Sequence, residues 1–540
     1  MGFKLIVLLR LSWVSVFTVI LGLVCTSWGL KQEVVRIPTA ASPFPDLYEA
    51  SIAELQAGLQ VGLFTSVDLV KACFARIEEV NLRGPALRAF IETNPSALAQ
   101  AAELDRERRK TAPPQCPSWH SATFERQHRD AGMDTAAGSY AILGSVVPRD
   151  AHVAAKLRAA GAILLGKANL SQWANFRGAG VPSGFSARGG QASNPYVPLG
   201  SPSGSSSGSG ITLGTETDGS IVLPSSANNV VGIKPSMGLT SRGGASRHSG
   251  TNGAFGCGRR CSIIAGRDPR DNYTSAAPAQ TPDYTRALDT EALRGARSGV
   301  PRRYIAAQLD GVQVAAFNAS LATLRKQGVT IVDPADFPAW EELLVWTNDT
   351  IVLKADFKVG VERYIAGLRE VPTGVKTLAD LITFNIAHAD EELVPPYWTD
   401  QSVFITADNT TIDQAFYDAL AADLDLGATR GIDAALKAFE LDALILPTNM
   451  ASTPPAIAGY PIVTVPLGFC PPDTPLSPAE PTRKSGPNMP FGLAFLGTAF
   501  SEFKLISFAY AYEQATHTRL KVRAFPAAIP KTQLADVVGT

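Results

Sequence analysis

The sequence has few of the residues from which metal sites and disulfide frameworks are built. It contains six cysteines and six histidines among 540 residues. No CxxC pair occurs, and no cysteine–histidine spacing is typical of zinc binding. A disulfide between Cys73 and Cys470 would be compatible with the sequence, but no spacing favours it. We therefore expect no metal site.

The chain also lacks an excess of charge of either sign. Its formal net charge is −1, and no block rich in lysine and arginine occurs, which argues against nucleic acid as a partner. With 45% hydrophobic residues the chain can bury a large core. Its 46 glycines and 38 prolines predict many loops, although no long polar segment is typical of disorder.

The N-terminus has the pattern of a targeting segment. Lys4 and Arg10 precede an apolar run from Leu11 to about Gly29, which predicts a signal peptide or an uncleaved signal anchor over residues 1–30. We therefore expect a protein that is secreted or lies in the endomembrane lumen, with membrane contact only through an anchor. Five N-x-[S/T] sequons are compatible with this route and with a glycoprotein: Asn169, Asn272, Asn318, Asn348 and Asn409. Asn169 lies in a motif that we expect to be buried.

Helical and strand patterns alternate along the chain. Residues 47–80 predict two amphipathic helices. Further helices are expected at 151–160 and 502–515, and strands at 162–166, 229–233, 443–446 and 462–466. Short buried strands alternating with helices predict an α/β/α sandwich around a large mixed, mostly parallel sheet. We expect a single domain over residues 31–540, in which a helical, aromatic-containing region at about 300–440 shapes a substrate pocket and residues 441–525 return to the sheet.

Two small-residue loops carry the candidate chemistry. Ser220 lies in the glycine-containing segment Gly214–Ile221, and a serine-rich loop, Ser201–Ser209, precedes it. A serine hydroxyl becomes a strong nucleophile only when a base takes its proton and donors stabilise the resulting oxyanion. Small residues suit this need because they let backbone N–H groups converge on one point.

Together the two loops resemble the amidase signature family, whose members hydrolyse amides with a Ser–cis-Ser–Lys triad, and in particular its secreted fungal and bacterial amidases. Further matching segments are 136–171, 221–227, 231–236, 458–468 and 490–493. The resemblance spans residues from about 45 to 525, with the signature region at about 135–265. It implies an acyl-enzyme mechanism, a small-molecule amide substrate, and neither a cofactor nor a metal.

The resemblance assigns roles to individual residues. It implies that Ser220 is the nucleophile and that Ser205, held by a cis peptide bond, relays the proton. It also implies an oxyanion hole made by the backbone N–H groups of Thr217, Asp218, Gly219 and Ser220. The segment from Ser205 to Ser220 is several residues shorter than in the family, so we expect the helix that connects the two serines to be truncated. The family includes an amidotransferase subunit that acts on charged transfer RNA, but the secretory segment argues against that role.

The lysine of the triad is missing from its expected place. No lysine occurs between Lys110 and Lys156, and the charged and polar residues that follow Trp119 make a poor buried strand. A reading frame shifted by one base from Trp119 to Ala131 can encode Gly-Ile-Pro-Leu-Leu-Leu-Lys-Asp-Asn-Ile-Ala-Thr, which resembles the family. The lysine would span the codons of Glu125 and Arg126.

A second segment, from Arg247 to Cys261, resembles the family in the same shifted frame. We interpret both segments as frame errors or misplaced introns in the gene model. The alternative is true divergence to a catalytically dead pseudoenzyme or binding protein. Arg126 cannot replace the base because arginine stays protonated. A histidine base at His128 is chemically sound, although no flanking motif supports it.

A different hydrolase scheme uses the neighbouring serine. The segment Gly204–Gly208 fits the G-x-S-x-G elbow of α/β-hydrolases, with Ser206 as nucleophile of an esterase-type enzyme. That elbow requires a strand immediately before it, whereas Asn194–Gly200 contains two prolines that oppose a central strand. The scheme would also need His388 or His517 to complete the triad.

Overall fold

The computed structural model describes residues 42–110, 120–125, 132–208, 213–244, 251–255, 258–307 and 311–540. It contains two compact units, a short one that ends at Leu63 and a large one from Phe64 to Thr540. The predicted signal segment lies outside the described residues. Within the described ranges, no helix combines the length and apolar character needed to cross a membrane.

The two predicted N-terminal helices are present. In the short unit, α2 (Ile52–Gln60) begins after Ser51, whose side chain and that of Glu54 form a capping box. In the large unit, α3 (Ser66–Val80) begins with the same arrangement between Thr65 and Asp68. Each box satisfies backbone N–H groups that a helix start leaves without partners, which explains where both helices begin.

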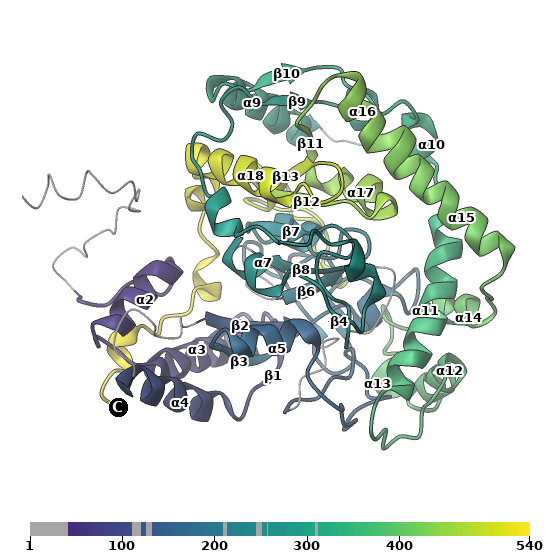
Figure 1. Ribbon diagram of the computed structural model, residues 1–540. Helices are drawn as coiled ribbons and strands as arrows, with labels where there is room; N and C mark the ends of the chain where they lie inside the picture. Colours follow the sequence, from purple (N-terminus) through teal and green to yellow (C-terminus); the bar gives the residue numbers. More distant parts are fainter. Residues whose placement is uncertain are drawn as a thin grey trace, which may run out of the picture. The chain divides into compact units, whose positions relative to one another are not determined.

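A mixed sheet forms the centre of the large unit (Figure 1). Over the described residues it has eleven strands in the order β1-β3-β2-β6-β8-β7-β12-β13-β11-β9-β10. Their bounds are β1 Phe90–Thr93, β2 His120–Glu125, β3 Ala162–Ala168, β6 Leu213–Glu216, β7 Gly232–Lys234, β8 Thr251–Phe255, β9 Arg297–Gly299, β10 Thr330–Val332, β11 Ala443–Pro447, β12 Ile462–Phe469 and β13 Pro490–Leu496. A separate pair consists of β4 (Phe185–Ser186) and β5 (Gly190–Gln191).

The predicted α/β fold around a mixed sheet is confirmed, but less of the sheet is parallel than the sequence predicts. Parallel pairing is confined to β3–β2–β6 on one side and β11–β9–β10 on the other. The ladders between β6 and β11 are antiparallel. Antiparallel strands need no helical crossover, and β12 joins β13 through the loop 470–489, which has no helix.

Helices pack on the sheet and bury its central strands. Every residue of β3, β11 and β13 is buried, as expected for strands covered on both faces. Helices α6, α9 and α18 contact β12, and α5 contacts β3. The helices of this part of the chain are α4 (Ala97–Lys110), α5 (His152–Ala159), α6 (Val222–Ala227), α7 (Gly258–Ile264), α17 (Thr453–Ala458) and α18 (Glu502–Thr516).

Most of the chain between residues 302 and 438 is helical (Figure 1, green). Its helices are α8 (Arg302–Ala306), α9 (Gly311–Lys326), α10 (Trp340–Leu344), α11 (Asp349–Ala366), α12 (Leu378–Ala387), α13 (Ala389–Glu392), α14 (Ser402–Asp408), α15 (Gln414–Leu424) and α16 (Asp433–Ala438). Phe357, Leu381 and Phe404 from this region form a buried cluster with Trp173. That cluster connects the helices to the segment that precedes the serine-rich loop.

The segment after Trp119 forms a strand, although its charged and polar residues were expected to make a poor buried one. β2 (His120–Glu125) runs parallel to β3 along its whole length and meets β6 at the Phe124–Leu213 pair. Main-chain hydrogen bonds to β3 do not depend on side-chain type, and the tertiary context of a strand often overrides its intrinsic preference. The sequence pattern alone could not reveal this.

The disulfide considered between Cys73 and Cys470 is not formed, because Cys73 is a free thiol. Burial raises the pKa of Cys73 to about 11, although the nearby Arg76 guanidinium acts in the opposite direction. The thiol is therefore protonated at neutral pH.

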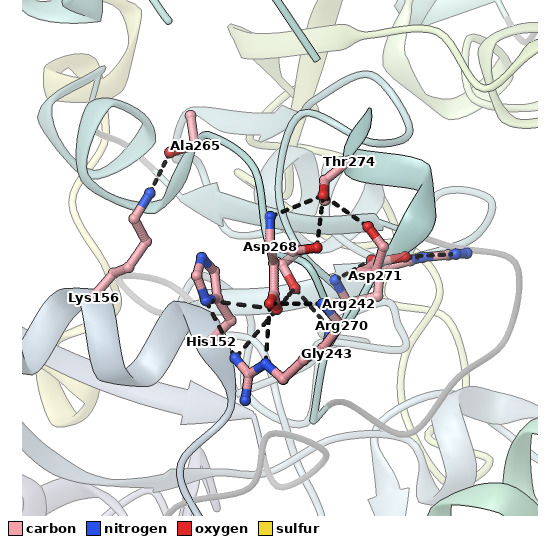
Figure 2. A network of polar contacts seen from close by, with 10 residues as sticks. His152, Lys156, Arg242, Gly243, Ala265, Asp268, Arg270, Asp271 and Thr274 are labelled. Carbon is pink, nitrogen blue, oxygen red and sulfur yellow. Dashed lines mark hydrogen bonds and ion pairs between the residues drawn. The ribbon is translucent and has the colours of Figure 1, made fainter. Parts of the chain in front are cut away.

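A polar network joins α5 to turns that follow β7 and α7 (Figure 2). The Asp268 carboxylate accepts hydrogen bonds from Ser241 Oγ at 2.6 Å and from Arg270 Nε at 3.0 Å. His152 Nδ1 lies 3.5 Å from the same carboxylate. Burial acts to raise the pKa of Asp268, but the bonds from Arg270 and Ser241 prevail and lower it to about 2. The network thus holds a buried negative charge.

Candidate active site

The loop that carries Ser220 connects β6 to α6. Gly219 has φ +79°, and a Cβ at this position would lie 2.5 Å from Leu223 Cδ1. Only glycine combines this backbone conformation with the close approach. Ser220 follows directly and is half-buried, just before α6 begins at Val222.

A buried carboxylate shapes this loop. Glu216 Oε1 accepts the N–H of Gly219 at 3.0 Å, and Oε2 accepts those of Ile221 at 2.7 Å and Val222 at 2.9 Å. Burial raises the pKa of Glu216, while the charge of Lys234 and the N–H donors act to lower it. The sequence interpretation missed this role. An acidic residue three positions before a loop glycine was the available signal, because such a spacing lets a carboxylate reach the loop N–H groups.

The four predicted oxyanion donors differ in availability. The Gly219 N–H is donated to Glu216. Those of Thr217, Asp218 and Ser220 have no protein acceptor in the described part of the chain. The Asp218 side chain accepts a hydrogen bond from Thr453 Oγ1 at 2.8 Å, which fixes the loop from the side of α17. Three N–H groups are therefore available to a bound carbonyl oxygen.

The serine-rich loop is buried and held by its backbone. The Gly204–Ser205 peptide bond is cis. The Ser205 carbonyl accepts the N–H groups of Ser171 and Ser207, both at 2.8 Å. Ser205 is 1% exposed, and its Oγ has no hydrogen-bond partner within the described ranges. A buried hydroxyl without a partner is costly in a folded protein, which marks this atom as a candidate functional group.

The two loops meet. The Ser206 N–H donates to the Ser220 carbonyl at 3.1 Å, and Ser206 Oγ donates to the Thr215 carbonyl at 3.3 Å. Between the two serines, the described residues 206–208 and 213–219 contain no helix, and residues 209–212 lie outside the described residues. Ser205 and Ser220 are thus held on neighbouring loops by direct backbone contact.

The place expected for the lysine lies at the same edge of the sheet. β2 ends at Glu125, which pairs with Ala168, and it runs parallel to β6. The carboxyl ends of parallel strands meet at one edge, so the end of β2 lies at the edge from which the Ser220 loop leaves β6. Arg126 and His128 lie outside the described residues.

A lysine on the neighbouring strand β3, Lys167, was not predicted as a site residue. Lys167 of β3 is fully buried, and its Nζ donates to Thr135 Oγ1 at 3.3 Å. Its Cα pairs with Phe124 of β2. A buried polar contact of this kind is consistent with a structural role beside β2.

The elbow scheme with Ser206 has no support in the geometry. Residues 192–204, which lead into this serine, form isolated bridges rather than a strand, so the strand that the elbow requires is absent from that segment. His388 and His517 are both exposed, and the His388 ring stacks on Phe384 with centroids 3.9 Å apart.

The predicted burial of Asn169 is confirmed. Its Nδ2 donates to the carbonyls of Arg88 at 2.8 Å and Gly190 at 3.1 Å. A glycan on this nitrogen is incompatible with the fold. The other four sequons have exposed asparagines: Asn272, Asn318, Asn348 and Asn409.

Comparison with known proteins finds similarity to amidases along most of the chain. The model of the Amidase family matches residues 68–506. A putative amidase of Arthroderma benhamiae is 38% identical over 550 aligned residues, which cover 93% of this chain and 91% of that protein. A probable amidase of Arabidopsis thaliana is 38% identical over 498 aligned residues, covering 88% and 91% respectively.

A solved structure of an amidase is also similar to this chain. The chain resembles the native peptide amidase from Stenotrophomonas maltophilia with a TM-score of 0.78 and 37% identity, covering 91% of this chain and 100% of that one. Fold and relatives together define an amide hydrolase. The chain belongs to the amidase family.

Proposed function

We propose that this protein hydrolyses the amide bond of small peptide amides with Ser220 as nucleophile and Ser205 as proton relay. Ser220 Oγ forms a bond to the carbonyl carbon, and its proton passes through Ser205 to the leaving nitrogen as the C–N bond breaks. Water then attacks the acyl carbon. Its hydroxyl completes the released acid as the bond from the acyl carbon to Ser220 Oγ breaks, and its other proton returns to Ser220 Oγ. The expectation of a peptide amide comes from the similarity to the peptide amidase of Stenotrophomonas maltophilia.

The backbone contact between the two serine loops carries this proposal. Because Ser206 N–H binds the Ser220 carbonyl at 3.1 Å, Ser205 and Ser220 are held close in the fold. The buried Ser205 Oγ without a partner among the described residues suits an atom that exchanges protons during reaction. The available N–H groups of Thr217, Asp218 and Ser220 suit an oxyanion hole.

The base of this mechanism requires the shifted reading frame. We propose that the natural protein carries a lysine at the end of β2, where Glu125 and Arg126 are now written. A lysine buried at that edge would have a lowered pKa and could accept a proton near neutral pH. The chain as written would then be inactive. A pseudoenzyme or binding protein remains the alternative if the transcript encodes this sequence.

Two steps test the proposal. The transcript is sequenced across codons 105–135 and 200–265, and both versions of the protein are assayed for ammonia release from a peptide amide. We expect the shifted frame in the transcript and turnover only by the corrected protein. Substantial Ser220-dependent turnover by the chain as written would overturn the role of the lysine. A corrected protein that folds but has no activity would overturn the amidase mechanism.

We also propose that the protein enters the secretory route through residues 1–30. Four exposed sequons support this proposal. Expression in a eukaryotic host should give a product whose mass falls after treatment with an N-glycosidase. A product that stays in the cytosol without glycans would contradict it.

A further inference from the structure

A pair of stacked aromatic rings lies beside the serine-rich loop. Trp398, from the segment between α13 and α14, stacks on Phe185 of β4 with ring centroids 4.4 Å apart and planes 14° apart. Phe185 is buried, whereas Trp398 is half-buried. The Tyr397 ring meets the Trp398 ring nearly edge-on, at 5.7 Å. Phe185 thus supports one face of an indole that stays partly open.

Two hydrogen bonds connect this indole to Ser183, which packs against Gly204 of the Gly204–Ser205 peptide. Trp398 Nε1 donates to Gln191 Oε1 at 3.2 Å, and Gln191 Nε2 donates to the Ser183 carbonyl at 2.8 Å. Ser183 packs so closely on Gly204 that a Cβ added there would lie 3.0 Å from Ser183 Cβ. The indole is therefore two hydrogen bonds and one packing contact away from the serine loop.

A buried arginine holds the segment that carries Trp398. The Arg177 guanidinium donates to the backbone carbonyls of Glu392 and Trp398, and to that of Asp400 at 3.2 Å. Arg177 is 1% exposed. Burial lowers the pKa of Arg177 to about 10, although the charges of Glu392 and Asp400 act in the opposite direction. The guanidinium remains charged at neutral pH and keeps three carbonyls of this segment in place.

The Glu392 carboxylate fixes the other end of the same segment. It accepts hydrogen bonds from Ser139 Oγ at 2.8 Å, from the Tyr140 N–H at 2.6 Å and from Gln172 Nε2. Glu392 is fully buried. Residues 392–400 are thus tied to the segments 139–140 and 171–177 by buried charged groups, so the position of Trp398 is set before any ligand arrives.

We propose that Trp398 is a specificity-determining residue that contacts the apolar side chain of the peptide amide next to the scissile bond. This inference rests on the proposed function of the Ser220 site. The indole N–H of Trp398 donates to Gln191, its backbone N–H donates to the Val394 carbonyl, and its carbonyl accepts from Arg177. The polar groups of this half-buried residue therefore have partners within the protein, and a ligand would meet mainly ring carbon. An aromatic or large aliphatic side chain is the occupant that gains most from such a surface, because ring contacts add to the burial of apolar area.

The test measures binding rather than turnover, in the full chain with Ser220→Ala. Dissociation constants of N-acetylphenylalaninamide and N-acetylglycinamide are measured by calorimetry for this protein and with Trp398→Ala added. We expect the phenylalanine amide to bind about tenfold more tightly, a difference of about 1.4 kcal/mol, and we expect Trp398→Ala to remove most of it. Tyr417→Ala, which removes an aromatic ring that is 56% exposed on α15, should leave it unchanged.

Equal affinity for the two amides, or discrimination that survives Trp398→Ala, would overturn the inference. If Trp398→Ala does not fold, the same comparison is made with Trp398→Phe. We expect this variant to lose about half of the difference in affinity between the two amides, and no loss would overturn the inference. The outcome is separable from the proposed function. Discrimination that depends on Trp398 without any turnover by the corrected protein would overturn the mechanism alone. Turnover by the corrected protein without any discrimination that depends on Trp398 would overturn the specificity role alone.

Discussion

The carbonyl of Ser220 accepts the N–H of Ser206 at 3.1 Å, so the backbone of one candidate loop is bound directly to the other. The contact involves the neighbour of Ser205 rather than Ser205 itself. It therefore places the two serines without consuming the Ser205 hydroxyl, which has no partner in the described part of the chain.

This relationship separates the two serine schemes. In the frame-corrected protein, Ser220→Ala should lower kcat by at least about 10³-fold, because the nucleophile is lost. Ser206→Ala should retain most activity, since the proposed mechanism gives the Ser206 hydroxyl no part in the reaction and its bond to the Thr215 carbonyl, at 3.3 Å, is long. Steady-state kinetics on one peptide amide measure both. The reverse order of effects would favour the elbow scheme.

Glu216 should matter for both stability and catalysis. Glu216→Gln replaces a carboxylate that accepts three loop N–H groups with an amide whose NH₂ cannot accept any of them. In the frame-corrected protein we expect a loss of about 1–3 kcal/mol in the free energy of unfolding, as for an unsatisfied buried group, and a lower kcat because the loop is displaced. Chemical denaturation and kinetics measure these. Glu341→Gln, at an exposed glutamate of α10, is the control and should change neither. A stable Glu216→Gln protein with full kcat would contradict the role.

The Asp268 network in Figure 2 predicts a loss of stability in acid. The folded-state pKa of Asp268 is lowered to about 2, below the value of about 3.9 expected in the unfolded chain. Its contribution is therefore complete above about pH 5 and is lost as the pH falls from about 4 to 2. Asp268→Asn should be less stable at pH 7 and should show a weaker dependence on pH over that window. Thermal unfolding from pH 2 to 7 checks both, and parallel curves for the two proteins would contradict the prediction.

Cys73 should resist alkylation in the folded protein. With a pKa of about 11, only about one thiol in a thousand is ionised at pH 8, and the thiolate is the reactive form. Mass spectrometry after iodoacetamide treatment should find Cys73 unmodified in the native state and modified after denaturation. Rapid native labelling at pH 8 would show that the thiol is accessible and ionised.

The sequence predicted those elements whose patterns are local. The helix at 151–160 and the strand at 162–166 correspond to α5 and β3, because helical spacing and a short apolar run are each visible within a few residues. Antiparallel pairing in the middle of the sheet could not be predicted this way, since pairing direction depends on how distant strands meet. The β12–β13 pair is an example. Its strands are antiparallel and are joined by the loop 470–489, which contains no helix, whereas alternating helices and strands would predict a helix between parallel strands.

Of the candidate site, only the two loops that carry Ser205 and Ser220 could be identified from the sequence. Ser205 and Ser220 were identified by resemblance, and their roles stay predictions. Glu216 was missed because its function is to bind main-chain N–H groups, for which the only sequence signal is its spacing of three residues from the loop glycine Gly219. Trp398 was not distinguished within the aromatic-containing region at about 300–440, since its partner Phe185 is more than 200 residues away in the chain and no periodicity connects them.

The position of β2 has a practical consequence for any test of the proposed reading frame. The strand is held by main-chain pairing to β3 along its length and to β6 at one pair, so the sheet specifies where this segment runs more than which side chains it carries. We therefore expect that the codons from Trp119 to Ala131, which include those of β2, can be exchanged as a cassette while β3 and β6 are left as they are. The proposed absence of the base and the stability of the fold can then be tested separately, because changing the side chains of this segment leaves its main-chain pairing in place.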